Sequence, residues 1–503
     1  MKVLFVTSEM RPYAQTGGLS DVAAALPKVL RRLGVETAVI MPRYGSVERS
    51  RLDTVCEFAV PFGSEQLPAS ILMDRTREGV AVYFVDAPRF FDRAGLYGEN
   101  GRDYEDNAAR FIFFSHAAVL FAKHGPFLPE IIHANDWFTG LVPVYLKTLY
   151  SGEASLARIR TVFTIHNLAY QGIFWHHEFP LTGLPWEVFR YDQLEFYGKM
   201  NLLKGGIAFA DRITTVSPRY AREILTAEFG CGLDAVLRFR ERHLSGIVNG
   251  IDTEVWNPAE DPYLPSTYSA DDLSGKYRCR EELQGLNNLP ISDAPLVGFI
   301  GRLTEQKGID ILLAAFERLM ERGVQFVLLG TGESRYETAF EELGRRYPLQ
   351  CGINVTFSDE LAHRIEAGCD LFLMPSRFEP CGLNQLYSHR YGTPPIVHAV
   401  GGLADTVEEF EEATRRGNGF RFEQYSAEAL LDALDRAVAV RSHPEAWGRL
   451  IGNCMATDWS WERSAKEYHS LYSELLAEAL SGVEPFHPAH ATTGRHGSWK
   501  EKV

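Results

Sequence analysis

The chain has little of what marks secreted, membrane-bound or nucleic-acid-binding proteins. Its 503 residues include seven cysteines, an odd number without a C-x-x-C pair, which fits a reduced cytosol better than a disulfide framework. No apolar run approaches the roughly 18 residues that a transmembrane helix needs. Basic residues are outnumbered by acidic ones, 51 to 66, for a net charge of −15, which argues against a nucleic-acid surface. We predict a cytoplasmic protein with neither a membrane nor a nucleic-acid partner.

Several catalytic motifs are missing as well. The absence of G-x-x-x-x-G-K-[ST], of G-x-G-x-x-G after the first apolar run and of G-x-S-x-G disfavours P-loop ATPases, dinucleotide dehydrogenases and α/β-hydrolases. There is no H-E-x-x-H, and His133 with Asp136 has no evident third ligand, so we predict no metal site. The opening run Met1–Val6 is too short for a signal peptide and is interpreted as the start of a β-strand.

Short apolar runs alternate with helical patterns along most of the chain, which is typical of parallel α/β sheets. The predicted strands are 3–7, 36–41, 80–85, 131–134, 160–165, 212–216, 246–248, 296–300, 325–329, 354–357, 371–374 and 395–398. The predicted helices include 19–33, 427–440 and an amphipathic segment at 459–476. Residues 253–290 lack this alternation of apolar runs and helical patterns. We interpret them as the crossing into the second domain together with a segment on the surface.

The length exceeds what one hydrophobic core organises, so two domains are expected. We place the first at residues 1–250, completed by the helix at 459–478, and the second at 251–458. Residues 481–503 are polar, and we expect them to be disordered. Each domain is expected to be of the α/β class with a parallel sheet, and the two domains are expected to face each other across a cleft.

Two glycine-rich loops follow predicted strands. One is Thr16–Leu19 and the other is Gly301–Gly308, which carries Arg302 and Lys307. Glycine lets backbone N–H groups approach an anion, and the helix that follows presents its positive end. An arginine fork beside a lysine suits a diphosphate. The alternative is that the two cations merely lie on an exposed loop.

Other polar clusters follow strands too, where ligands bind in open α/β sheets. Glu379 lies in a Glu-Pro-Cys-Gly turn predicted to open a helix, so it is either functional or a residue that caps the helix. The segment 401–406 repeats the order of strand, glycine and helix. The clusters at 133–137 and 166–172 carry histidines, for which a satisfied, partly buried imidazole is the alternative; His176–His177 is interpreted as a surface pair.

Together these motifs resemble the bacterial glycogen synthase and plant starch synthase family over residues 1 to about 476. The motifs are T-S-E-M-x-P with T-G-G-L-S-D-V, H-A-N-D-W, T-I-H-N-L-A-Y-Q-G, V-N-G-I-D, G-R-L-T-E-Q-K-G, P-S-R-F-E-P-C-G-L and G-G-L-A-D-T-V. The resemblance implies the GT-B fold, in which two Rossmann-like domains are separated by a deep cleft. It also implies transfer of glucose from ADP-glucose to the non-reducing end of an α-1,4-glucan, with retention of configuration. It implies neither a metal nor another cofactor.

The resemblance also assigns roles to individual positions. It implies that Arg302 and Lys307 neutralise the leaving diphosphate, that Glu379 contacts the donor sugar, and that His166 lies beside the glucosyl carbon. The remaining expected contacts are the loop at Gly17 and Gly18 for donor phosphate and sugar; Asp136, Asn167, Tyr97 and Asn249 for the sugar and acceptor; Phe357 for adenine; and the backbone of Cys381, Gly382, Leu383 and Gly402 for phosphate or glucose.

The chain departs from the family motif K-T-G-G-L at Gln15, where the family has lysine. A neutral amide forms weaker hydrogen bonds to phosphate than a cation does, so the donor nucleotide stays open. The alternatives are another retaining GT-B glucosyltransferase that uses UDP-glucose, or a non-catalytic glucan-binding homologue. A phosphorylase is disfavoured because no pyridoxal phosphate lysine is evident.

Overall fold

The computed structural model describes residues 1–99, 101–483, 486 and 488, and these form two compact units. Unit 1 comprises residues 1–216, 221–247 and 464 onward, and unit 2 comprises residues 217–220 and 248–463. The division falls inside helix α16 (Trp461–Leu480). The disorder expected for 481–503 falls mainly on residues outside the described ones.

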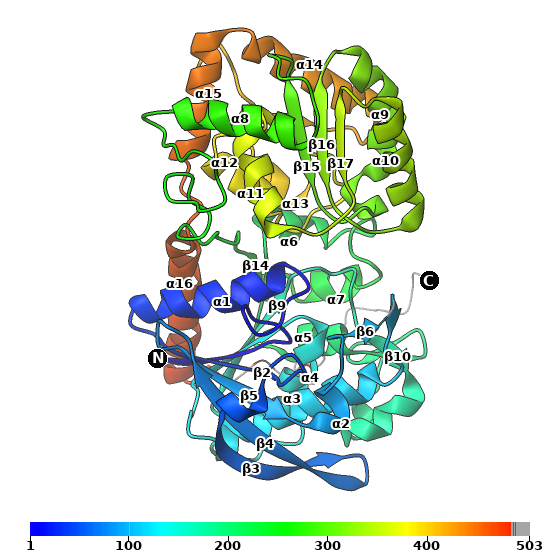
Figure 1. The fold of residues 1–503 in the computed structure, drawn as a ribbon. Helices are drawn as coiled ribbons and strands as arrows, with labels where there is room; N and C mark the ends of the chain where they lie inside the picture. The colour runs from blue at the N-terminus through cyan, green and yellow to red at the C-terminus, as the bar shows by residue number, and fades with distance from the viewer. Residues whose placement is uncertain (100, 484–485, 487, 489–503) are drawn as a thin grey trace. The chain divides into compact units, whose positions relative to one another are not determined.

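Unit 1 contains a nine-stranded sheet in the order β14-β13-β9-β8-β1-β2-β5-β4-β3 (Figure 1). Its strands are β1 (Lys2–Val6), β2 (Glu36–Pro42), β3 (Asp53–Phe62), β4 (Glu65–Arg75), β5 (Ala81–Asp86), β8 (Ile131–Asn135), β9 (Arg160–Ile165), β13 (Arg212–Thr215) and β14 (Leu244–Gly246). All neighbours are parallel except the pairs β3–β4 and β4–β5.

Helices surround this sheet. They are α1 (Gly18–Arg32), α2 (Pro88–Phe91), α3 (Asn107–His124), α4 (Leu141–Lys147), α5 (Leu202–Phe209), α7 (Asp234–Phe239) and most of α16, while α6 (Pro218–Glu223) lies at the division. Helices α1 and α3 pack directly on strands of the sheet. Nearly all of α3 is buried, as expected for a helix that is apolar on all sides. Two small sheets complete the unit: β6 (Gly98–Glu99) with β7 (Arg102–Asp103), and the three strands β10 (Ile173–Trp175), β12 (Lys199–Asn201) and β11 (Glu195–Phe196).

Unit 2 contains a six-stranded, fully parallel sheet in the order β17-β16-β15-β18-β19-β20. Its strands are β15 (Leu296–Ile300), β16 (Gln325–Leu329), β17 (Cys351–Asn354), β18 (Leu371–Met374), β19 (Pro395–His398) and β20 (Phe420–Phe422). Its helices are α8 (Ser274–Leu286), α9 (Ile309–Glu321), α10 (Ser334–Arg346), α11 (Asp359–Gly368), α12 (Asn384–Arg390), α13 (Gly401–Thr406), α14 (Ala427–Arg441) and α15 (Pro444–Ala456). Successive side chains of β15 point to opposite faces of the sheet, where they belong to two hydrophobic cores. Val297 and Phe299 lie in one core and Leu296 lies in the other.

Both large sheets reverse their strand order at one point. In unit 2 the order counted along the chain is 3-2-1-4-5-6, and it reverses between β15 and β18. In unit 1 the parallel strands follow the same scheme and reverse between β1 and β8. The loops after the two strands diverge at such a point and leave a crevice at the carboxyl ends, which is where ligands bind in doubly wound sheets.

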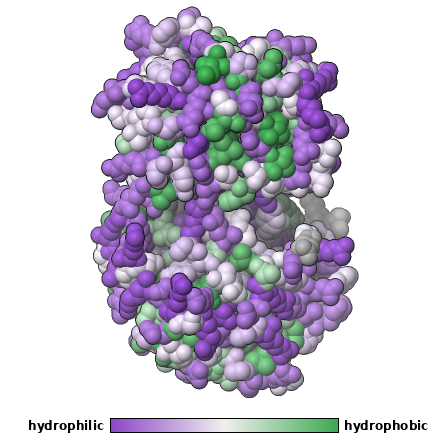
Figure 2. All heavy atoms as spheres, in the orientation of Figure 1, coloured by the Kyte–Doolittle hydropathy of each residue, from purple (hydrophilic) through white to green (hydrophobic). Residues whose placement is uncertain are grey.

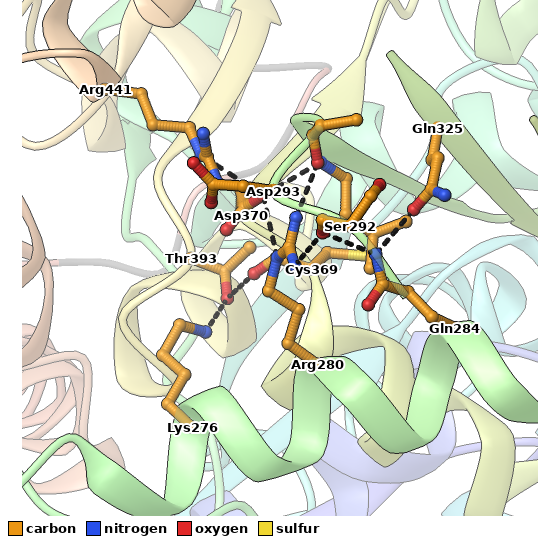
Figure 3. A network of polar contacts seen from close by, with 12 residues as sticks. Lys276, Arg280, Gln284, Ser292, Asp293, Gln325, Cys369, Asp370, Thr393 and Arg441 are labelled. Carbon is orange, nitrogen blue, oxygen red and sulfur yellow. Dashed lines mark hydrogen bonds and ion pairs between the residues drawn. The ribbon is translucent and has the colours of Figure 1, made fainter. Parts of the chain in front are cut away.

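A polar network fixes α8 to the sheet of unit 2 (Figure 3). The guanidinium of Arg280 donates to the carbonyls of Ser292 and Ala294 at 2.7 and 2.5 Å and lies 3.2 Å from the carboxylate of Asp370. Asp370 is also 3.2 Å from Arg441. The expectation that 253–290 is irregular is therefore wrong for α8, which is an integral part of this unit.

Most predicted strands and helices are present, and the bounds of two strands are displaced by more than one residue. β14 begins at Leu244 rather than Gly246, and β17 ends at Asn354, where the prediction began. None of the described helices is long and apolar enough to cross a membrane. Figure 2 shows one face of the molecule, on which hydrophilic residues predominate and apolar residues form separate patches.

Candidate active site

In unit 1, the glycine loop after β1 folds around a buried carboxylate. Glu9 is 3% exposed and accepts hydrogen bonds from the backbone N–H of Thr16 at 2.5 Å, the Thr16 hydroxyl at 2.6 Å and the N–H of Gly17 at 3.3 Å. Gly17 precedes the first residue of α1, Gly18, and a Cβ on Gly17 would have no atom within 4 Å. The loop surface at Gly17 is therefore open to an approaching ligand.

Tyr97 joins this loop from a distant part of the chain. Its hydroxyl donates to Glu9 Oε1 at 2.6 Å, and its ring stacks on Phe138 with centroids 4.4 Å apart. The structure thus brings the predicted Tyr97 to the end of β1. The sequence analysis assigned no role to Glu9, although an acidic residue three positions after the end of the first strand was a signal for one.

Gln15, the departure from the family motif, is exposed on the same loop. Its Oε1 accepts a hydrogen bond from Arg11 Nε at 2.7 Å. Arg11 Nε is also 3.2 Å from Asp21, on the first turn of α1. A cation therefore lies beside Gln15, already engaged by an amide and a carboxylate.

Asp136 directly follows β8 and is buried. Its Oδ1 accepts the backbone N–H of His166 at 2.8 Å, and the N–H of Asn167 also faces it. Burial raises the pKa of Asp136 to about 7 despite these two donors. Its φ of 55° is unusual for a residue other than glycine. The loops after the neighbouring strands β8 and β9 are thus joined through this carboxylate.

His166 begins the loop after β9, with Nε2 3.0 Å from Asn135 Oδ1. Desolvation lowers the pKa of His166 to about 3, so the imidazole is neutral at physiological pH. Asn167 Oδ1 accepts the N–H of Ala169 at 3.0 Å and shapes the following turn. His133, in contrast, points into the core, where its ring nitrogens lie 2.7 Å from Tyr472 and 2.5 Å from Thr164.

In unit 2, the loops after β15 and β18 meet through Lys307 and Glu379. Lys307 Nζ lies 2.6 Å from Glu379 Oε2, and the Ser376 hydroxyl donates to the same oxygen at 3.0 Å. Gly308 makes this approach possible, because its φ is 73° and a Cβ there would lie 1.9 Å from the carbonyl oxygen of Pro375. Two residues 72 positions apart in the chain therefore form one partly buried contact.

Glu379 does not cap the following helix. α12 begins at Asn384, five residues further on, and its N-cap Leu383 makes no side-chain cap. The interpretation of Glu379 as a helix-capping residue is therefore wrong. Its carboxylate instead points to Lys307 at the point where the strand order reverses.

Glycines also hold the loop after Glu379 in place. Gly382 has a φ of 74° and lies against Gln385, while a Cβ on Gly402 would come within 2.1 Å of the Cys381 carbonyl oxygen. The N–H of Gly402 donates to the Glu379 carbonyl oxygen at 3.0 Å. Gly402 thus positions the backbone of Glu379, and any contact of Gly402 with a ligand remains a prediction.

The other predicted residues of unit 2 differ in how far they are exposed to solvent. Arg302 is exposed on the loop after β15, and Phe357 is 76% exposed just before α11. Asn249 is buried, and in the described residues its Oδ1 has no hydrogen-bond partner. Its backbone N–H faces the thiol of Cys381, whose pKa burial raises to about 12.

At its reversal point unit 1 offers the buried carboxylate of Glu9 and the open glycine loop, and unit 2 offers Lys307 paired with the buried carboxylate of Glu379, with Arg302 exposed on the same loop as Lys307. This set suits a ligand with a diphosphate and a polar ring. Within the part of the chain that is described, no three His, Cys, Asp or Glu side chains gather as a metal site would need.

Comparisons with known proteins agree on one family. A model described as the starch synthase catalytic domain matches residues 2–239, and a model described as glycosyl transferases group 1 matches residues 286–450. A glycogen synthase from Anaeromyxobacter sp. (strain Fw109-5) is 51% identical over 95% of this chain and 100% of its own. A glycogen synthase from Marinobacter nauticus is 46% identical over 95% of this chain and 98% of its own.

A solved structure shares the fold. It is the catalytic domain of starch synthase IV from Arabidopsis thaliana bound to ADP and acarbose. It is 36% identical, with a TM-score of 0.87 over 94% of this chain and 99% of that chain. The two parallel α/β units are accordingly those of a GT-B glycosyltransferase.

Proposed function

We propose that this chain, which belongs to the glycogen synthase and starch synthase family, transfers glucose from ADP-glucose to the non-reducing end of an α-1,4-glucan with retention of configuration. Family membership makes it a glycosyltransferase. The choice of ADP is supported by the starch synthase structure bound to ADP and acarbose.

The contact between Lys307 and Glu379 carries this proposal. It lies where β15 and β18 diverge, so a diphosphate in that crevice meets Lys307 and the exposed Arg302. The leaving diphosphate gains negative charge as the glycosidic bond breaks, and preorganised cations act most strongly on charge that develops in the transition state. Glu379, released from Lys307, faces the donor sugar and stabilises the positive charge that grows at its anomeric carbon.

Residues of unit 1 serve the sugar and the acceptor in this proposal. The imidazole of His166 is neutral, and the backbone N–H of His166 donates to Asp136. The main chain and ring of His166 therefore offer dipoles rather than a charge to the glucosyl carbon. Tyr97 and Asn167 contact hydroxyl groups. The open loop at Gly17 and Gly18 receives donor phosphate and sugar.

The remaining contacts belong to unit 2. Phe357 stacks on adenine, and its exposed ring supports this role. Asn249 offers its unpartnered buried oxygen to a sugar hydroxyl, as far as the described residues show. The backbone at Cys381, Gly382, Leu383 and Gly402 lines the phosphates or glucose. We further propose that no metal or organic cofactor takes part. A cytoplasmic location is supported by seven cysteines that are all free thiols.

One experiment tests the function and the donor together. The enzyme is supplied with ADP-glucose or UDP-glucose and maltotriose, and both nucleotide release and chain length are measured. We expect glucan growth with ADP-glucose and much slower growth with UDP-glucose. Faster growth with UDP-glucose would assign the donor to the other nucleotide, a choice that Gln15 leaves plausible. Absence of growth with both donors would refute the proposed function.

A further inference from the structure

The small sheet of unit 1 exposes aromatic rings that the proposed transfer site does not use. Trp175 is 59% exposed on β10, and Tyr197 is 84% exposed in the turn between β11 and β12. His177, Lys199 and Phe196 lie around them. We call these five residues the aromatic surface.

Printed contacts connect the members of the aromatic surface across three strands. Lys199 Nζ lies 4.7 Å from the centroid of the Trp175 ring, and the His177 ring is nearly parallel to that of Trp175, at 5.9 Å and 14°. Lys199 pairs with Trp175 on one side and with Phe196 on the other. The Phe196 ring packs edge-on against Tyr197 at 4.8 Å. The surface thus spans two strand spacings, about 10 Å, which is wider than one sugar ring.

The backbone of Tyr197 is held in an unfavourable conformation. Its φ is 49° and that of Gly198 is 76°, and the two residues form the tight turn of the β11–β12 hairpin. Such turns favour Asn-Gly, because a bulky side chain is strained at positive φ. Tyr197 is almost fully exposed, so its ring gains little burial in return. Strain of this kind concentrates at functional sites.

The opposite face of the small sheet packs on the loop that follows β8 in the same unit. Phe174, on the other face of β10, contacts Trp137 with ring centroids 5.6 Å apart. Trp137 directly follows Asp136. A ligand chain bound along the small sheet therefore lies one layer away from the loop that carries Asp136.

We infer that the aromatic surface binds an α-1,4-glucan chain at a distance from the transfer site, an inference that rests on the proposed function. The faces of glucose rings present C–H groups, which pack on exposed aromatic rings, and the hydroxyl groups at their edges reach polar neighbours such as His177 and Lys199. A growing glucan is a polymer, so a second contact keeps its chain ends near the transfer site. This raises their effective concentration without any new contact at the reacting atoms.

The test compares Trp175→Ala and Tyr197→Asn with the wild-type enzyme. Binding is measured as retardation in native gels that contain glycogen, with and without competing maltoheptaose, and this readout needs no turnover. The matched control is Tyr277→Ala, which removes a ring that is 63% exposed on α8 of unit 2. Kinetics are measured with glycogen and with the short acceptor maltotriose.

We expect each variant to weaken glycogen binding about tenfold, as the loss of one aromatic contact does. The KM for glycogen rises accordingly, while kcat/KM for maltotriose and the behaviour of Tyr277→Ala stay unchanged. The Tm of Tyr197→Asn stays equal or rises, because Asn relieves the strain; a purely structural tyrosine would lower it.

Two results overturn the inference and leave the proposed function intact. One is that glycogen retards both variants in native gels as strongly as it retards the wild-type enzyme. The other is a change of oligomeric state in the variants during sedimentation, which would assign the surface to a second copy of the chain. Absence of transfer to maltotriose in the wild-type enzyme would instead refute the proposed function. The gels would still show whether the aromatic surface binds glycogen, because they need no turnover.

Discussion

Glu379→Gln separates the contact with Lys307 that the structure shows from the role at the donor sugar that we propose. In the absence of ligand, Glu379 is 5% exposed and engages Lys307 at 2.6 Å. The proposed function requires Lys307 to turn to the diphosphate and Glu379 to serve the sugar. The substitution keeps the size and one hydrogen bond of the side chain and removes its charge.

The two roles predict opposite effects on binding and turnover. A hydrogen bond to a charged group contributes about 1.5–3 kcal/mol, and a neutral acceptor contributes roughly half of that. Glutamine therefore frees about 1 kcal/mol of the attraction that holds Lys307, and the Kd for ADP stays unchanged or falls up to about fivefold. Loss of the charge at the sugar lowers kcat by about 10²–10³-fold, equivalent to about 2.7–4 kcal/mol.

Calorimetric titration with ADP and steady-state kinetics measure the two effects. The control is Glu317→Gln, the same change at a 62% exposed carboxylate that pairs with Arg346 on the surface. An exposed pair of this kind contributes under about 1 kcal/mol, so the control keeps wild-type values. A kcat near that of the wild type would refute the role at the sugar. A Kd for ADP that rises tenfold would show that Glu379 holds the nucleotide site together.

Three further predictions concern single sites. Burial raises the pKa of Asp136 to about 7, so the folded protein keeps a proton that the unfolded chain loses near pH 4, and stability falls as pH rises between these values. The Tm of Asp136→Asn should therefore exceed that of the wild type by an amount that grows from pH 4 to 7 and then levels off. A difference in Tm that is constant with pH would contradict the raised pKa. Gly402→Ala should displace the Glu379 backbone and abolish most activity, because the new Cβ would meet the Cys381 carbonyl oxygen. The control is Gly452→Ala in α15, where a Cβ has no atom within 4 Å. This variant should keep its activity and gain up to about 1 kcal/mol of stability in thermal unfolding. Gln15→Lys should lower the KM for the donor, though by less than tenfold because Arg11 lies beside it; an unchanged KM would show that this position does not meet the phosphates.

Parallel strands were predictable because they are buried on both faces. Arg160–Ile165, Leu296–Ile300 and Leu371–Met374 have their predicted bounds, since each is an apolar run that ends at polar or glycine residues. The β3–β4 hairpin was missed because β3 is largely exposed, which leaves no continuous apolar run in the sequence.

Helix α8 was missed for a different reason. Its buried positions include Lys276 and Gln284, so the apolar periodicity that marks a helix is broken by polar residues. The Lys276 ammonium donates to Thr393 at 2.7 Å and to two backbone carbonyls. Such compensation depends on residues more than ninety positions away, and local patterns carry no trace of it.

The location of the candidate site followed from strand ends, but its internal contacts did not. Lys307 and Glu379 come together only because β15 and β18 are neighbours at the reversal of the strand order. Sequence reasoning found both residues and gave them separate roles. Neither the ion pair nor the part that Gly308 has in it can be inferred before the order of the strands is known.

The two units share a further property that bears on ligand selection. In unit 1 the buried carboxylate of Glu9 occupies the N–H groups of Thr16 and Gly17, and in unit 2 the buried carboxylate of Glu379 occupies Lys307. Each group of donors is therefore satisfied without ligand, because an unpaired buried charge or donor would be costly. A ligand can take these donors only by offering at least as much negative charge as the carboxylate that it displaces. A diphosphate meets this condition and a neutral sugar does not, so we expect these donors to prefer a diphosphate to an uncharged glucan. The ADP affinity of Glu379→Gln tests this argument directly for unit 2.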